Sequence, residues 1–445
     1  MTVWRGVRFG KTAHPFAPST VAEPADVAPG GEFGPAPMQI EQPAFPLGAP
    51  TSTDSLFLNI WAPDGAADLP VLIWVYGGGF EAGAASAPWF DGDLLARETP
   101  CVVVTVNYRV GAFGFAALDH LDTADAVLSG AHNLGLGDVV TAMQWVAQNI
   151  EGFGGDPAAI TLAGHSAGGF LTAAAAVAPG APTLRAIACF SGGASRIVSR
   201  SAADELGTRL VDELGLRSAP AEIIAAPPET VLAAQGVVGP RALDVRNGRS
   251  PRGFGVVDDA DAAAPLVPRH PMDAIAQGAL RDTFLLSSAA LDEAEGFPVG
   301  MIDAPDVSSF RERAEEFCGS AAVAEALLER ADGDVDTAWR TLLSDFIYRL
   351  PAVRAADAQG AAGGRAMHLD ISRADGEPAV HGTEVGALFG RGAGARDEEI
   401  SRVFRRLIAT GTIQPAGFHV VGDPLPAQRV AGPALLGLWA GVSRP

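Results

Sequence analysis

ITLAGHSAG, residues 160–168, is the stretch that decides the fold of this 445-residue chain. Its apolar first half precedes a Gly-x-Ser-x-Gly pattern, and a helical run of small residues follows at 170–178. A strand that turns sharply into a helix lifts the central side chain above the sheet, and flanking glycines let strand and helix approach closely. The pattern therefore predicts a nucleophile elbow with Ser166 at its tip.

A second glycine-rich segment follows another apolar run. Residues 69–75, LPVLIWV, read as a buried strand that leads into YGGGF at 76–80. The amides of Gly78 and Gly79 have no side chains around them and are free to bind an oxyanion, with the Ala167 amide as a third donor. Preorganised N–H groups of this kind stabilise the negative oxygen of a tetrahedral intermediate by several kcal/mol.

Several further blocks surround these two motifs in a fixed order. They are TDSLFLNIW at 53–61, NYRVGAFGF at 107–115, NLGLGD at 133–138 and FGGDP at 153–157. Together with the elbow they resemble the type-B carboxylesterase/cholinesterase family of α/β-hydrolases, which includes bacterial carboxylesterases, and the resemblance covers most of residues 4–430. It implies an α/β-hydrolase fold with a mostly parallel central sheet and helices on both faces.

The resemblance also implies one catalytic domain over 1–445. Residues 1–52, rich in Pro, Gly and Ala, are expected to wrap the surface, and residues 217–280 to form a cap or pocket insertion. Apolar runs predict strands at 56–61, 70–75 and 102–107, and near 186–190, 283–287 and 366–371. This alternation with helical segments is typical of a parallel sheet covered on both faces.

The family's chain order, serine then acid then histidine, guides the search for the other catalytic residues. In relatives the acid is the Glu immediately before a Gly in the loop after a strand, which here is Glu295. Asp292 and Glu293 lie in the same loop and are alternatives, because a small shift would bring either to the histidine.

The family's histidine loop is matched by AVHGTE at 379–384, which places the catalytic base at His381. His368 and His419 are the alternatives, although His368 follows an apolar stretch and is expected on a strand. In this scheme one ring nitrogen of His381 contacts the acid and the other takes the Ser166 proton.

Pocket residues are less well defined by the sequence. Phe80, Trp89 and Phe389 are candidates for lining an apolar substrate pocket, with plain core packing as the alternative for each. His165 stands where the family usually carries Glu and is expected to act behind the reacting groups. Its presence removes one negative charge beside the site, so a preference for quaternary ammonium substrates is not implied.

These residues predict a serine carboxylesterase that hydrolyses carboxylic esters through an acyl-enzyme intermediate. An amidase or carbamate hydrolase would use the same triad. A non-catalytic binding protein of the same fold is the third possibility, but such relatives typically lose the Ser or the His. The expected partner is a small-molecule ester.

Composition bounds the remaining functions. The net charge of −21 disfavours binding to nucleic acid or to anionic membranes. No metal-ligand spacing and no nucleotide-binding fingerprint occur, so neither a metal nor another cofactor is expected. The three cysteines, Cys101, Cys189 and Cys318, are widely spaced and are expected to be unpaired, which favours a cytoplasmic location. The protein is expected to be a monomer or a homodimer.

Overall fold

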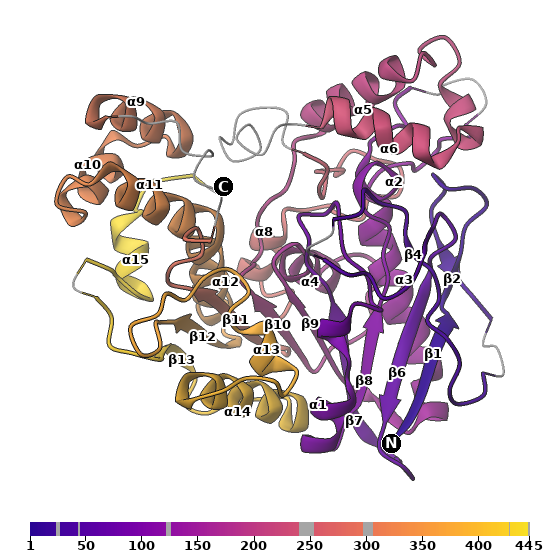
Figure 1. Ribbon diagram of the computed structural model, residues 1–445, viewed down its shortest axis with the longest axis horizontal. Helices are drawn as coiled ribbons and strands as arrows, with labels where there is room; N and C mark the ends of the chain where they lie inside the picture. Colours follow the sequence, from indigo (N-terminus) through magenta and orange to yellow (C-terminus); the bar gives the residue numbers. More distant parts are fainter. Residues whose placement is uncertain are drawn as a thin grey trace.

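A computed structural model describes residues 1–23, 27–42, 45–121, 126–239, 253–296, 306–426 and 428–443. Its centre is a nine-stranded sheet in the order β1-β6-β8-β7-β9-β10-β11-β12-β13 (Figure 1). β6 pairs antiparallel with β1 and with β8, and the remaining neighbours in this sheet pair in parallel. The mostly parallel sheet expected from the sequence is thereby confirmed.

The strands of this sheet are β1 (Thr2–Arg8), β6 (Phe57–Ala62), β7 (Leu69–Val75), β8 (Val102–Val106), β9 (Gly155–His165), β10 (Ala186–Phe190), β11 (Phe284–Ala290), β12 (Arg365–Ile371) and β13 (Gly417–Val421). Two short pairs lie outside it, β2 (Gly10–Lys11) with β3 (Thr20–Val21), and β4 (Ala36–Pro37) with β5 (Thr51–Ser52). All five residues of β8 are buried, as expected for a strand covered on both faces.

Helices lie on both faces of the sheet (Figure 1). α4 (Ala167–Ala176) packs on β9 and β10, and α12 (Leu350–Ala361) packs on β11 and β12. α1 (Asp93–Glu98) contacts β6 and β8, while α14 (Ala395–Thr410) contacts β7 and β13. The other helices and helical turns are η1 (Pro88–Phe90), α2 (Gly111–Phe115), α3 (Leu134–Asn149), η2 (Ile150–Phe153), α5 (Arg200–Glu213), η3 (Pro220–Ala225), α6 (Pro228–Val238), α8 (Pro271–Ala276), α9 (Val307–Cys318), α10 (Ala321–Arg330), α11 (Val335–Ser344), η5 (Asp345–Arg349), α13 (Val385–Leu388) and α15 (Pro433–Leu438).

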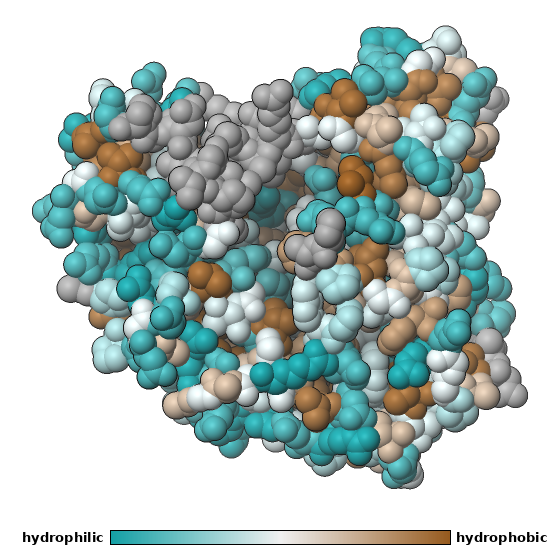
Figure 2. All heavy atoms as spheres, viewed as in Figure 1, coloured by the Kyte–Doolittle hydropathy of each residue, from teal (hydrophilic) through white to brown (hydrophobic). Residues whose placement is uncertain are grey.

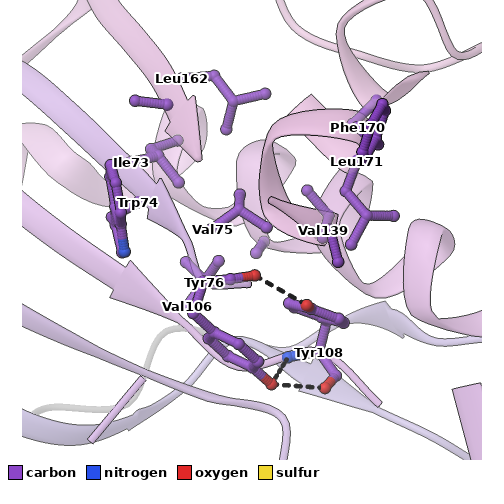
Figure 3. Packing of buried hydrophobic residues seen from close by; sticks show 14 of the residues in the cluster. Ile73, Trp74, Val75, Tyr76, Val106, Tyr108, Val139, Leu162, Phe170 and Leu171 are labelled. Carbon is purple, nitrogen blue, oxygen red and sulfur yellow. Dashed lines mark hydrogen bonds between the residues drawn. The ribbon is translucent and has the colours of Figure 1, made fainter. Parts of the chain in front are cut away.

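Two stacked tyrosines fix the strand end from which the glycine-rich loop starts (Figure 3). Tyr76 Oη donates to the Tyr108 carbonyl at 2.9 Å, and Tyr108 Oη donates to the Tyr76 carbonyl at 2.8 Å. Both side chains are fully buried, with ring centroids 4.4 Å apart. This reciprocal pair ties the end of β7 to the segment after β8, so the loop at 77–79 leaves from a rigid base.

A second hydrophobic cluster lies beside the sheet, among α9, α10, α11 and α15 (Figure 1). Trp339 packs edge to face against Phe310, and Phe346 stacks on Trp439. The Arg349 guanidinium joins this cluster to the sheet because it is fully buried and pairs with both Asp345 and Asp370. The π-helical turn η5, which carries Tyr348, is therefore anchored at the edge of the candidate site described below.

Two segments differ from the sequence-based expectation or extend past it. Residues 2–8 do not wrap the surface but form β1, an edge strand of the main sheet, because Val3, Trp4 and Val7 suit a pleated surface. Within 217–280, α6 and α8 are helical, and 240–252 lie outside the described residues. The cap role of that region and the single domain over 1–445 stay predictions.

The surface is mainly hydrophilic on the face shown in Figure 2, with scattered apolar residues. Among the described residues no helix combines the length and the apolar character that crossing a bilayer requires.

Candidate active site

The turn from β9 into α4 has the geometry of a nucleophile elbow. The backbone of Ser166 has φ +56° and ψ −124°, a conformation that residues other than glycine rarely adopt. The Ser166 amide donates to the Phe190 carbonyl at 2.8 Å. A Cβ on Gly168 would lie 2.1 Å from the Val75 carbonyl oxygen, and one on Gly164 would lie 2.4 Å from the Gly168 oxygen. Both glycines are therefore required by the close approach of strand and helix.

A chain of hydrogen bonds runs from Ser166 through His381 to a carboxylate. Ser166 Oγ lies 2.9 Å from His381 Nε2, and His381 Nδ1 lies 2.5 Å from Glu293 Oε2. The three residues follow the ends of β9, β12 and β11, so parallel strands bring their loops to one edge of the sheet. Because the carboxylate accepts from Nδ1–H, Nε2 is left as the acceptor for the serine hydroxyl.

The structure corrects the expected carboxylate from Glu295 to Glu293. Glu293 is fully buried and its second oxygen accepts the Ala290 amide at 2.8 Å, which fixes it toward His381. The Glu295 side chain is 47% exposed and lies 3.8 Å from Arg340 Nε instead. Asp292, the other alternative, is buried but pairs with Arg373 and Arg429.

Neither alternative histidine is placed against Ser166. His368 is buried on β12, where Nδ1 lies 2.9 Å from Ser287 Oγ. His419 lies on β13, next to β12 at the edge of the sheet. His381 is therefore the histidine that the described residues bring to the elbow.

Gly78 and Gly79 line the same cavity as Ser166, and Ala167 follows Ser166 directly in the chain. Gly78 and Gly79 both have positive φ, and their amides donate to no acceptor among the described residues. Ala167 is the first residue of α4, so its amide has no intrahelical acceptor. A Cβ on Gly78 would lie 2.0 Å from the Ala82 carbonyl oxygen, whereas nothing lies within 4 Å of one on Gly79. The loop is thus tightly packed at Gly78 and open at Gly79.

A cavity of about 590 Å³ opens above Ser166. Its lining includes Trp89, Phe45, Tyr348, His165 and His381, together with the glycines at 77–79. Among the predicted pocket residues, Trp89 and His165 lie in this lining, while Phe80 lines a smaller neighbouring cavity.

The structure corrects the expectation for Phe389, which does not line either cavity. It is fully buried, with its ring centroid 5.0 Å from that of Trp74 and 5.7 Å from that of Phe90. Phe389 belongs to the core because α13 turns its side chain onto the sheet.

Two buried titratable groups lie behind His381. The His165 ring centroid is 4.7 Å from that of His381, and burial together with the neighbouring His381 holds the pKa of His165 well below its usual value. His165 is therefore neutral at pH 7. Glu384 is fully buried and accepts from Ser191 Oγ at 2.9 Å, and burial together with the Glu293 charge raises the pKa of Glu384 to about 7.

The sequence motif contained Glu384 but gave it no role, and Tyr348 was not singled out. The Tyr348 ring centroid lies 4.6 Å from that of His381, so this residue forms one wall beside the base. The signal for Glu384 is its position three residues after His381, in the turn that leads into α13.

One group of side chains among the described residues has the composition of a metal site, namely Asp119, His120 and Asp204. Arg200 already donates to Asp119 and to Asp204, each at 2.7 Å. His132 adds a second cation between Asp119 and Asp259. The cluster is an ion-pair network that joins α5 to Asp119, His132 and Asp259.

Comparison with known proteins agrees with this geometry. A model of the carboxylesterase family matches residues 1–409. Para-nitrobenzyl esterase of Bacillus subtilis (strain 168) is 29% identical over 365 residues, covering 80% of this chain and 72% of that protein. Fumonisin B1 esterase of Sphingopyxis macrogoltabida is 33% identical over 351 residues, covering 77% of this chain and 62% of that protein.

Solved structures give the same result. A PNB esterase structure is 26% identical with a TM-score of 0.80, and the match covers 94% of this chain and 92% of that one. A carboxylesterase of Geobacillus stearothermophilus at pH 6.2 is 29% identical with a TM-score of 0.77, covering 96% and 88%. Fold and matches together define a carboxylic ester hydrolase with the α/β-hydrolase fold. Within this class, the chain belongs to the carboxylesterase family.

Proposed function

We propose that the protein hydrolyses carboxylic esters through an acyl-enzyme on Ser166, with His381 as general base and Glu293 as its orienting carboxylate. The observation that carries the proposal is the continuous contact from Ser166 Oγ to His381 Nε2, at 2.9 Å, and from His381 Nδ1 to Glu293, at 2.5 Å. Serine is a weak nucleophile at its ordinary pKa and needs such a base.

In the first half-reaction Ser166 Oγ attacks the ester carbonyl while His381 Nε2 takes the hydroxyl proton. The carbonyl oxygen becomes an oxyanion that accepts hydrogen bonds from the amides of Gly78, Gly79 and Ala167. When the intermediate collapses, the carbon–oxygen bond to the alcohol breaks and His381 returns the proton to the leaving alcohol. The acyl group is then an ester of Ser166.

In the second half-reaction water takes the place of the alcohol. His381 removes a proton from water as the hydroxide attacks the acyl carbon, and the same amides hold the second oxyanion. Collapse breaks the bond to Ser166 Oγ, which recovers its proton from His381, and the acid leaves. The Glu293 carboxylate accepts from Nδ1–H and stabilises the imidazolium that forms twice in each cycle.

The size and lining of the cavity bear on the substrate. Its volume of about 590 Å³ lies within the usual range for small-molecule sites, and Trp89, Phe45 and Tyr348 supply aromatic surface. Relatives are named for para-nitrobenzyl and fumonisin B1 esters. We infer that an ester with an aromatic or similarly bulky apolar arm fits this space.

The cysteines support an intracellular, reducing location. Cys101, Cys189 and Cys318 are buried and unpaired. Burial raises the pKa of Cys101 and of Cys189 to about 12, so both stay protonated thiols near neutral pH.

The test is hydrolysis of a p-nitrophenyl ester series, from acetate to octanoate, by the wild type and by Ser166→Ala. We expect turnover by the wild type and a loss of about 10⁴-fold or more in the variant, since triad residues act as a unit. A matched p-nitrophenyl butyrate and p-nitrobutyranilide pair separates esterase from amidase activity. A folded wild type that is inert on every ester would contradict the proposal.

A further inference from the structure

Arg196 is a cation in the lining of a cavity beside the candidate active site. It lies in the segment between β10 and α5, and its side chain is half-buried. Its guanidinium makes no hydrogen bond or ion pair with any residue that the structure describes. Arg109 and Arg349, which are more deeply buried, each pair with aspartate. No nitrogen of Arg196 is among the fully buried side-chain atoms that lack a partner, so the five donors of its guanidinium stay open to solvent and to a ligand.

The backbone of Arg196 is also strained. Its φ of +64° lies in the left-handed region, which glycine or asparagine adopts at lower cost. A long side chain held in this conformation typically costs about 1–3 kcal/mol and persists only where the surroundings or a function fix it. Strain and an unpaired charge thus coincide at one residue.

The cavity that Arg196 lines adjoins the site of ester attack. It is bounded by Gly79, Phe80, Glu81, Arg196 and Val198, with residues 253–255, and has a volume of about 30 Å³. One water needs about 10–15 Å³, so the space suits two waters or one group of carboxylate size. Gly79 also lines the larger cavity above Ser166, and nothing lies within 4 Å of the position of its missing Cβ. The two cavities therefore meet at the amide donor of Gly79.

Tyr348, in the wall of the larger cavity, lies in the neighbourhood of Arg196. Burial lowers the pKa of Arg196, and Tyr348 acts on that pKa in the opposite direction. Tyr348 itself lies against His381. The other arginine that lines the larger cavity, Arg391, donates to the carbonyls of Pro88 and Asp91.

We propose that Arg196 is a specificity-determining residue that binds an ionised carboxyl group of the substrate, so that preferred esters carry a second, free carboxylate. The inference rests on the proposed function, because it concerns what the same site accepts. A guanidinium and a carboxylate form two parallel charge-assisted hydrogen bonds, and a planar three-atom group fits the small cavity. The bound carboxylate would supply the partner that none of the described residues provides.

Glu81 lines the same small cavity and is the one acidic residue among the described residues of its lining. It forms no ion pair with Arg196, and burial raises the pKa of Glu81, which a hydrogen bond from Gln235 partly offsets. A substrate carboxylate therefore faces one full positive charge and a carboxyl group whose ionisation burial disfavours. Glu81→Gln serves as the matched control, because it changes the same cavity without removing the cation.

The experiment compares kcat/KM for two matched substrate pairs. In the first pair the carboxylate is on the acyl side, p-nitrophenyl hydrogen glutarate against p-nitrophenyl pentanoate. In the second it is on the alcohol side, 4-acetoxybenzoate against its methyl ester. Wild type, Arg196→Gln, Arg196→Lys, Glu81→Gln and Ser166→Ala are measured with each pair, and the affected pair identifies the arm that reaches Arg196.

In Arg196→Gln we expect the preference for the anionic member of one pair to fall by about 10- to 100-fold, as for the loss of charge-assisted hydrogen bonds. Turnover of the neutral member should stay within about threefold, and Arg196→Lys should keep part of the preference. Glu81→Gln should keep or increase it.

The inference is overturned if Arg196→Gln still hydrolyses neutral esters and keeps the wild-type ratio of kcat/KM, anionic to neutral member, in both pairs. The proposed esterase function would then stand. Failure of the wild type on every ester would reject both. If Arg196→Gln does not fold, inhibition of wild-type p-nitrophenyl acetate hydrolysis by glutarate, compared with glutaramide, decides the matter. Equal inhibition by the two would count against a carboxylate site.

Discussion

Glu293 contacts His381 with one carboxylate oxygen and the backbone at the end of β11 with the other. Oε2 lies 2.5 Å from His381 Nδ1, and Oε1 accepts the Ala290 amide at 2.8 Å. The second bond prevents the carboxylate from turning away, so the imidazole keeps the tautomer that leaves Nε2 facing Ser166. Glu295, two residues further on, has neither contact.

This relationship predicts different outcomes for two chemically identical substitutions. Glu293→Gln should lower kcat for p-nitrophenyl esters by about 10³–10⁴-fold, because an amide favours the wrong histidine tautomer. Glu295→Gln removes only a half-exposed ion pair and should change kcat by less than about twofold. Steady-state kinetics with circular dichroism on both variants make the comparison, and equal losses would argue against Glu293 as the orienting acid.

Glu384 predicts a pH-dependent stability. Burial and the Glu293 charge raise its pKa from 4.5 to about 7 in the folded protein. The folded state therefore keeps a proton that the unfolded chain loses, and this contribution to the free energy of unfolding is complete below about pH 4.5 and lost as the pH rises through about 7. Glu384→Gln should flatten that fall.

Urea unfolding at several pH values across this window measures the effect, with Glu295→Gln as the control for removing an exposed carboxylate. If the free energy of unfolding falls with pH as steeply in Glu384→Gln as in the wild type, Glu384 is not the titrating group.

His132 predicts a second pH range, at higher pH, in which the stability of the folded protein falls. Burial would lower its pKa, but the carboxylates of Asp119 and Asp259 outweigh burial and raise it from 6.5 to about 9. Its stabilising contribution is complete below about pH 6.5 and lost as the pH rises through about 9. His132→Gln should remove that loss, whereas His419→Gln should keep it. Thermal unfolding between these pH values distinguishes the two.

An elbow glycine and a helix glycine predict opposite effects on stability for two Gly→Ala substitutions. Gly168→Ala would place a Cβ 2.1 Å from the Val75 carbonyl oxygen, so strand or helix must move and stability should fall by several kcal/mol. Gly360 lies in α12 with nothing within 4 Å of its missing Cβ, so Gly360→Ala should stabilise by about 0.5–1 kcal/mol. Denaturant unfolding of both variants gives the two signs directly, and a stable Gly168→Ala protein would contradict the packing described here.

The features predictable from the sequence are those set by local pattern. The elbow is predictable because an apolar strand, two glycines and a small-residue helix follow one another in one short stretch. The apolar composition of Val102–Val106 likewise predicts a buried strand. β1 was missed because Val3, Trp4 and Val7 are embedded in a region rich in Pro, Gly and Ala, and their pairing partner lies far along the chain.

The carboxylate was misplaced for a different reason. After β11 the chain turns, with the Glu295 amide donating to the Asp292 carbonyl at 2.9 Å, and this turn points Glu293 inward and Glu295 outward. A motif that only requires Glu before Gly does not determine the direction of side chains in that turn. The sequence did not single out Arg196 for a related reason. Whether a charged side chain has a partner depends on residues far along the chain, whose positions the sequence alone does not give.

The central claim, that Ser166 is the nucleophile activated by His381, is tested most directly by covalent trapping. The wild type is treated with a p-nitrophenyl phosphonate, which forms a stable analogue of the acylated serine, and the labelled peptide is located by mass spectrometry. The account predicts one adduct per chain on Ser166, activity lost in proportion to labelling, and slow labelling in His381→Ala. Complete inactivation with the adduct on another residue, or full activity in a chain labelled at Ser166, would contradict it.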